Sequence, residues 1–203
     1  MTAILKVDTI QDTAGNNIIN ENANTVTIGK AGDTVNVVGT LQNNSSALVS
    51  GITGADQWRI TADHSGVGDV TANWERADSD GFNYIGTGMT ESSGIFTFPE
   101  TGIWSIQFIS MPYVSGTDTA YLLSTIETTT DNSTYGTASR SYVSLYETTA
   151  YSNANCYFIF DVTNTTTHKC KFKLAQNQAG TPIFQGQTEH NSTFATFIRL
   201  GDT

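Results

Sequence analysis

The chain has 203 residues, of which 38% are hydrophobic and 14% are charged, and its formal net charge at pH 7 is −10. This length and hydrophobic content allow one domain with a packed core together with an extension. The acidic balance disfavours nucleic-acid binding, because neutralising phosphates requires clustered Lys and Arg. No apolar run approaches transmembrane length and the first residues lack the apolar segment of a secretory signal, so we expect no membrane insertion and no classical export.

Residues 1–40 differ from the rest of the chain, because they contain no aromatic residue and are rich in Asn, Thr, Gly and Asp. Two units, Thr25–Gly29 and Thr34–Gly39, alternate polar residues with Val or Ile and end in Gly, which predicts a strand followed by a turn. Such a strand cannot bury its apolar face alone, but it is stable when stacked on copies from other chains. We predict a β-rich anchor or shaft at residues 1–40, with a disordered tail as the alternative.

Residues 41–56 are rich in Ser, Asn and Gly, which predicts a neck or linker. From residue 57 onward the aromatic content rises, and short alternating segments are separated by turn residues. The main predicted strands are Trp58–Thr61, Ala120–Thr128, Arg140–Tyr146, Asn155–Val162, His168–Ala175 and Phe194–Leu200. No helical period is sustained over three turns. The predicted fold class is therefore all-β, with a jelly-roll β-sandwich of two antiparallel sheets at residues 57–203.

The stretch Met89–Met111 predicts two strands joined by the corner Pro99–Gly102. Side chains alternate along a strand, so one face of the second strand is expected to enter the core with Trp104, Ile106 and Phe108. Ile103 and Ile109 make its other face partly apolar as well. A strand that is apolar on both faces is expected to be buried on both faces, here against the core and against a second subunit.

Several apolar side chains remain on outer faces once the predicted core is filled. The candidates for a trimer interface are Ile103, Ile109, Tyr157, Ile159 and Phe197. A large apolar patch of this kind usually marks an interface, and a closed three-fold ring suits a head carried on a stalk. The periodicity of the sequence does not distinguish a trimer from a dimer.

The two cysteines, Cys156 and Cys170, lie in predicted strands that we expect to pair as a hairpin around Asn164–Thr167. In a symmetric hairpin they would not face each other. We therefore predict two free, buried thiols, which suits assembly in a reducing cytoplasm.

The sequence predicts no catalytic residue, no cofactor and no metal site. His64, His168 and His190 have no partner at metal-ligand spacing. The acidic segment Asp63–Asp69, with Asp78 and Asp80, offers oxygen ligands for calcium but lacks EF-hand spacing, which favours a solvated loop. Neither a nucleophile elbow nor a phosphate-binding loop occurs.

Two sets of side chains are candidates for contact with another surface. Lys169, Lys171 and Lys173 are predicted to form an outward stripe, which suits an anionic glycan or an acidic neighbour but is also common as a solvated face. Tyr142 and Tyr146 belong to a Ser/Thr/Tyr-rich region, and Tyr combines a rigid ring with a polar tip.

The run Gly94–Trp104, with its Phe-Pro-Glu-Thr-Gly corner, resembles a motif of the complement C-one-q and tumour necrosis factor (TNF) superfamily. The resemblance covers residues 57–203, although no collagen-like repeat precedes them. It implies a jelly-roll head that forms a homotrimer through the sheet containing the first, the long central and the last strands.

The segments Leu5–Asp12, Thr27–Val35 and Gln57–Asp63 resemble tail-fibre, head-fibre and appendage proteins of bacteriophages, notably those of marine bacteria. This resemblance implies a homotrimeric virion fibre assembled in the cytoplasm of a bacterial host. Residues 1–40 would attach to a capsid or tail protein, and the head would bind a host-surface glycan or protein. Two alternatives stay open: a capsid decoration protein without a receptor, and a glycan-degrading tailspike using acids such as Glu127, Glu147 or Asp161.

Overall fold

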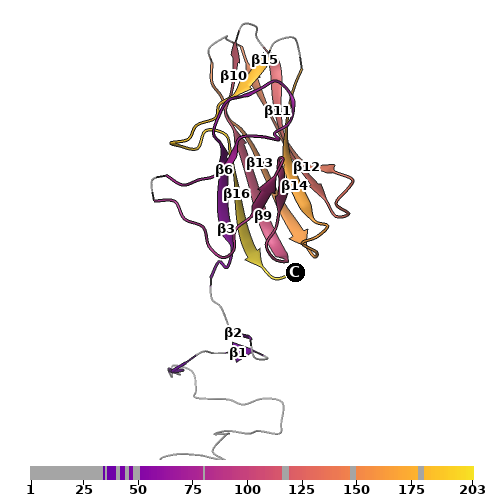
Figure 1. The fold of residues 1–203 in the computed structure, drawn as a ribbon. Coiled ribbons are helices and arrows are strands. Elements are labelled where there is room, and N and C mark those ends of the chain that lie inside the picture. Colours follow the sequence, from indigo (N-terminus) through magenta and orange to yellow (C-terminus); the bar gives the residue numbers. More distant parts are fainter. Residues whose placement is uncertain are drawn as a thin grey trace, which may run out of the picture. The chain divides into compact units, whose positions relative to one another are not determined.

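The computed structural model describes residues 34, 36–39, 42–43, 46–47, 51–79, 81–115, 119–146, 150–177 and 181–203. The chain divides into two units, Met1–Leu48 and Val49–Thr203, each of which is described by itself. Every regular element within the described residues is a strand, as the sequence predicts (Figure 1). The described part of the chain contains no helix long and apolar enough to cross a membrane.

Among its described residues, the first unit has one antiparallel pair, β1 (Gln42–Asn43) and β2 (Ser46–Ala47). The prediction of a strand at Thr34–Gly39 is wrong for residues 36–38, which are not in a strand. Val37 and Val38 are exposed there, because no strand among the described residues covers their apolar side chains. The predicted strand Thr25–Gly29 lies outside the described residues.

The second unit is a sandwich of two main antiparallel sheets (Figure 1). The five-stranded sheet has the order β13 (Ala154–Val162), β9 (Gly102–Ser110), β16 (Phe194–Gly201), β3 (Ala55–Ile60) and β6 (Trp74–Arg76). The six-stranded sheet has the order β12 (Gly136–Leu145), β11 (Thr119–Thr129), β14 (Lys169–Asn177), β8 (Ile95–Thr97) and β7 (Thr90–Ser92), and β5 (Gly68–Asp69) also pairs with β14.

A smaller sheet joins β10 (Pro112–Ser115), β15 (Thr181–Phe184) and β4 (His64–Ser65). Figure 1 shows β10 and β15 at one end of the sandwich, with the beginning of β3 and the C-terminus at the other end. The chain therefore enters the sandwich at the end remote from the β10–β15–β4 sheet.

The core is an aromatic cluster held between the two main sheets. Phe172 of β14 stacks on Phe108 of β9 with ring centroids 4.5 Å apart, and Phe96 of β8 lies 5.2 Å from Phe197 of β16. Trp74 of β6 closes one side, 5.0 Å from Phe96. Large buried rings with offset or edge contacts are among the strongest sources of core stability.

Strand β9 begins at the corner that the sequence predicts. Gly102 has φ +145°, and a Cβ there would lie 2.6 Å from the Gly201 carbonyl oxygen, so the close approach of β16 requires glycine. From Gly102 to Ser110, buried and half-buried residues alternate without interruption. This confirms the prediction that Trp104, Ile106 and Phe108 enter the core.

The predicted hairpin around Asn164–Thr167 is wrong. Strand β13 pairs with β9 in one sheet, and β14 pairs with β11 and β8 in the other. Because the inner faces of both strands are apolar, the chain crosses the core from one sheet to the other instead of folding back on itself. Cys156 and Cys170 are nevertheless free and buried as predicted, and burial raises the pKa of Cys156 to about 11.

We predict that Phe172→Ala destabilises the protein by about 3–5 kcal/mol, because it removes the ring that contacts Phe108, Phe96 and Trp74. The free energy of unfolding from urea titration measures this change. Leu200→Ala is the control, because Leu200 is 55% exposed and should change stability by less than about 0.5 kcal/mol. Equal losses in the two variants would contradict the assignment of the core.

Candidate interaction face and pocket

The outer face of the five-stranded sheet is organised in rows, because antiparallel pairing aligns side chains across neighbouring strands. Three successive rows are Asn155–Ile109–Phe194–Arg59, Tyr157–Gln107–Thr196–Gln57 and Ile159–Ser105–Ile198–Ala55. The first and third rows contain most of the apolar side chains. The middle row is polar.

Four of the predicted interface residues lie on this outer face. Ile103 and Ile109 are half-buried on β9, and Tyr157 and Ile159 on the edge strand β13 are 60% and 63% exposed. The structure therefore places these four residues on a common face. Their contact with a second copy of the chain stays a prediction.

Phe197 does not belong to this face, and the prediction that it faces outward is wrong. It is 0% exposed, pairs in register with the buried Ile106 and lies within ring contact of Phe96. Alternation along β16 is as predicted, but the opposite set of side chains faces outward. Phe194 and Ile198 occupy the outer positions.

The polar side chains of the middle row form hydrogen bonds within the chain. Gln57 Nε2 donates to Thr196 Oγ1 at 2.9 Å, and Gln107 Nε2 donates to Tyr157 Oη at 2.9 Å. Asn191 Nδ2 extends the row by donating to Gln57 Oε1 at 2.6 Å. A polar band therefore crosses the otherwise apolar face and ends beside Asn191.

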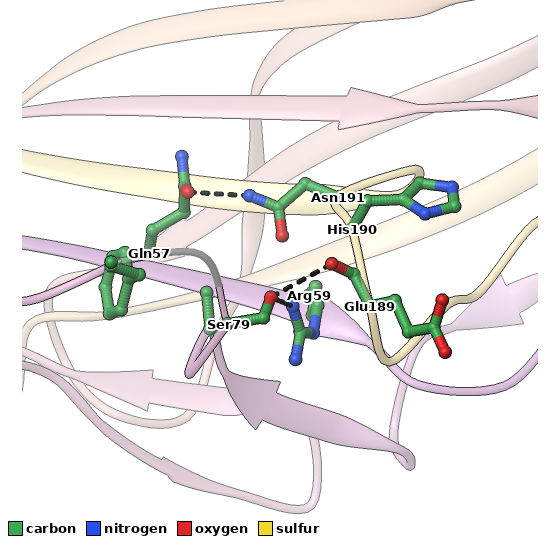
Figure 2. Close-up of a pocket in the computed structure, with 9 residues that line it drawn as sticks. Gln57, Arg59, Ser79, Glu189, His190 and Asn191 are labelled. Carbon is green, nitrogen blue, oxygen red and sulfur yellow. Dashed lines mark hydrogen bonds between the residues drawn. The ribbon is translucent and has the colours of Figure 1, made fainter.

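A pocket of about 360 Å³ opens at the β3 end of this band (Figure 2). Its lining comes from three separate segments: Gln57 and Arg59 on β3, then Ala77, Ser79, Gly81 and Phe82, and finally Glu189, His190 and Asn191. Sequence analysis missed this pocket, because its residues come together only through the pairing of β3 with β6 and β16. None of the three segments carries a recognisable motif.

Arg59 organises the pocket from below. Its side chain is 1% exposed, Nη1 donates to Ser79 Oγ at 2.8 Å, and Nη2 donates to Asp78 Oδ1 at 2.6 Å. Nε lies 3.5 Å from Glu75 Oε2. Ser79 Oγ in turn donates to the Glu189 carbonyl oxygen at 3.0 Å, so one chain of hydrogen bonds joins the floor to both walls (Figure 2).

The lysine stripe (Lys169, Lys171 and Lys173) lies on the other main sheet, and its ammonium groups pair with groups of the same chain. Lys169 is buried rather than outward, and its Nζ donates to the Thr165 carbonyl oxygen at 2.7 Å. Lys171 Nζ lies 2.8 Å from Asp69 Oδ2 and 3.3 Å from Glu127 Oε2. The prediction of a free outward stripe is therefore wrong for Lys169, and the acidic neighbours of Lys171 belong to the same chain.

Burial and charge pairing shift the pKa values of two of these lysines in opposite directions. Burial lowers the pKa of Lys169. At Lys171 burial acts in the same direction, but the hydrogen bond to Asp69 and the charges of Asp69 and Glu127 outweigh it and raise the pKa of Lys171. Lys173, at 3.7 Å from Glu127 Oε1, is the exposed member of the stripe.

We predict that Lys171→Met destabilises the protein by about 1 kcal/mol more than Lys173→Met, because it leaves the buried carboxylate of Glu127 and the side chain of Asp69 without their nearest cation. Thermal and urea unfolding at neutral pH measure the difference. A stripe that serves only as a ligand surface would instead give two variants of unchanged stability.

The remaining predicted contact residues, Tyr142 and Tyr146, are exposed. Tyr142 lies on β12, where its ring contacts Tyr121, and Tyr146 directly follows that strand. Apart from Phe197, which is in the core, the predicted site residues therefore fall into two groups, one associated with each main sheet.

The acidic residues of the proposed calcium loop have partners among the described residues. Asp63 accepts from Tyr113 Oη and the Gly186 amide, Asp69 pairs with Lys171, and Asp78 pairs with Arg59. Within the described ranges, no three His, Cys, Asp or Glu side chains are grouped to hold a metal ion. Asp80 lies outside the described residues.

No known family model matches the chain, and no curated protein matches it in sequence. Solved structures do match its fold. Murine APRIL at pH 5.0 has 16% identity and a TM-score of 0.53, covering 72% of this chain and 98% of that chain. The Eiger TNF from S. frugiperda has 12% identity and a TM-score of 0.54, covering 73% and 93%. Both are TNF-family proteins, and the fold of this chain is accordingly a TNF-like jelly roll, as predicted.

Proposed function

We propose that the protein is a homotrimeric virion fibre or adhesin protein, which attaches to a bacteriophage particle through its N-terminal residues and presents a jelly-roll head to the host surface. The observation that carries the proposal is the half-buried apolar face of the five-stranded sheet. Ile109, Phe194 and Ile198 lie there with the exposed Tyr157 and Ile159. An apolar face of this kind requires cover, which a second and third copy of the chain supply.

The distribution of apolar residues favours a ring over a two-fold dimer. Tyr157 and Ile159 lie at the β13 edge of the sheet, whereas the exposed Tyr84 and Ile85 follow β6 at the other edge. Two different patches at opposite edges suit a head-to-tail contact, and head-to-tail contacts close into rings when the rotation between neighbouring subunits permits closure. The TNF-like fold supports the same assembly through the sheet that contains β3, β9 and β16.

The direction of the head also supports the proposal. The chain enters the sandwich at the end remote from the β10–β15–β4 sheet (Figure 1). A head held at its entry end presents the remote end outward, where Tyr113 and the exposed Tyr151 form a ring pair with centroids 5.1 Å apart. Aromatic residues with polar tips are favoured in surfaces that recognise varied partners. The resemblance of the N-terminal segments to phage appendage proteins is the basis for proposing that the particle is a bacteriophage.

We predict that Ile159→Asp converts the trimer into a folded monomer, because it places a charge on an exposed apolar edge without disturbing the core. Sedimentation velocity and circular dichroism measure assembly and folding separately. Tyr142→Asp, on the exposed face of the other main sheet, is the matched control and should remain trimeric. Phe197→Asp should unfold the chain instead, because Phe197 is in the core.

We predict that deleting residues 1–40 leaves a folded, trimeric head but abolishes incorporation into phage particles. The physical reason is that every described residue of the hydrophobic core belongs to the unit Val49–Thr203. Sedimentation of the purified protein and mass spectrometry of purified particles measure the two outcomes. Loss of the trimer on deletion would assign assembly to the N-terminal segment, and unchanged incorporation would contradict its role as anchor.

A further inference from the structure

We propose that the pocket over Arg59 is a binding site for a single neutral sugar residue of a surface glycan. This inference rests on the proposed function, because it names the ligand class of the head and the residues that select it. The pocket volume of about 360 Å³ lies at the lower end of the range for small-ligand sites, which suits one ring rather than an extended ligand.

The pocket is built before any ligand arrives. Arg59 is fixed by Ser79 and Asp78, and Ser79 is bonded to the Glu189 carbonyl across the pocket (Figure 2). On the facing side, Asn191 is fixed by its bond to Gln57. A site whose polar groups are already positioned loses little entropy when a weak ligand binds.

Its free hydrogen-bonding groups match hydroxyl groups. Asn191 Oδ1 is a buried acceptor without a hydrogen-bond partner among the described residues. The Arg59 guanidinium carries five N–H donors, of which Ser79 and Asp78 accept two and the ion pair of Nε with Glu75 engages a third, so two N–H groups on its terminal nitrogens remain for a ligand. A pair of neighbouring sugar hydroxyls donates to Asn191 and accepts from Arg59, while the apolar face of the ring contacts Phe82 at the pocket wall.

The charges at the pocket floor disfavour ionic ligands of either sign. Glu75 and Asp78 flank the one buried guanidinium, so an anionic ligand meets more negative than positive charge. A cationic ligand would have to approach Arg59 itself, at the pocket floor. A neutral polyhydroxylated ring avoids both costs and pairs with Asn191 Oδ1.

The test uses the full-length protein and ligand-observed NMR with methyl glycosides. We expect saturation transfer to neutral methyl hexosides (glucoside, galactoside or mannoside), and affinity at least about tenfold weaker for methyl glucuronide and for the free-amine methyl glucosaminide. Asn191→Ala and Phe82→Ala should each weaken neutral-sugar binding by about tenfold or more. Asn153→Ala, an exposed Asn outside the pocket lining, is the control and should bind as the unmodified protein does.

Parallel sedimentation and particle-adsorption assays separate this inference from the proposed function. Absence of neutral-sugar binding, or binding unaffected by both pocket variants, overturns the sugar site while a trimer that still adsorbs to host cells keeps the proposed function intact. Loss of the trimer in both pocket variants, without sugar binding, would show that a neighbouring subunit fills the pocket and would also overturn the sugar site. Failure of the unmodified protein to form trimers or adsorb refutes the proposed function, whatever sugars bind.

Discussion

The central position of strand β9, which is buried on its inner face and partly apolar on its outer face, is the constraint from which the rest of the head follows. Its inner side chains Trp104, Ile106 and Phe108 are fully buried, and its neighbours β13 and β16 add Phe160 and Phe197 to the same core. Its outer side chains Ile103 and Ile109 remain half-buried in a single chain. A central strand that is apolar on both sides stabilises the monomer with one face and leaves the other to be covered.

The charged side chains of the head mainly stabilise the single chain, because its few cations are mostly paired with acids of the same chain. Arg76 pairs with the buried Asp56 at 3.1 Å and lies over the rings of Trp58 and Tyr84, at 4.9 and 4.6 Å from their centroids. Arg59 and Lys171 are each paired with two acids. Such pairs hold loops onto sheets, since breaking one leaves a buried charge alone.

Alternation in the sequence was sufficient to predict the fold class and most inner faces, because a residue period of two is a local property. The face of a strand that enters the core depends on its partners, which are not local. Phe197 and Ile198 are both apolar, and only the pairing of Phe197 with Ile106 assigns Phe197 to the core. The prediction for the β13–β14 connection was wrong for the same reason, because a tight turn is compatible both with a hairpin and with a crossing between sheets. The pocket had no local signal at all, since its third segment, Glu189–Asn191, is separated from the other two by most of the chain.

The polar band on the outer face connects assembly to recognition. Gln107 and Thr196 lie between apolar rows, and hydrogen bonds from Tyr157 to Asn191 satisfy much of the band within one chain. Covering such a band with another subunit costs less than burying unpaired amides, and its position fixes the register of the contact. In the proposed ring, the head would carry three copies of the Arg59 pocket. If each binds a sugar as proposed, the three together would convert a weak contact with a repeating glycan into lasting attachment, because after the first contact the others bind at high effective concentration.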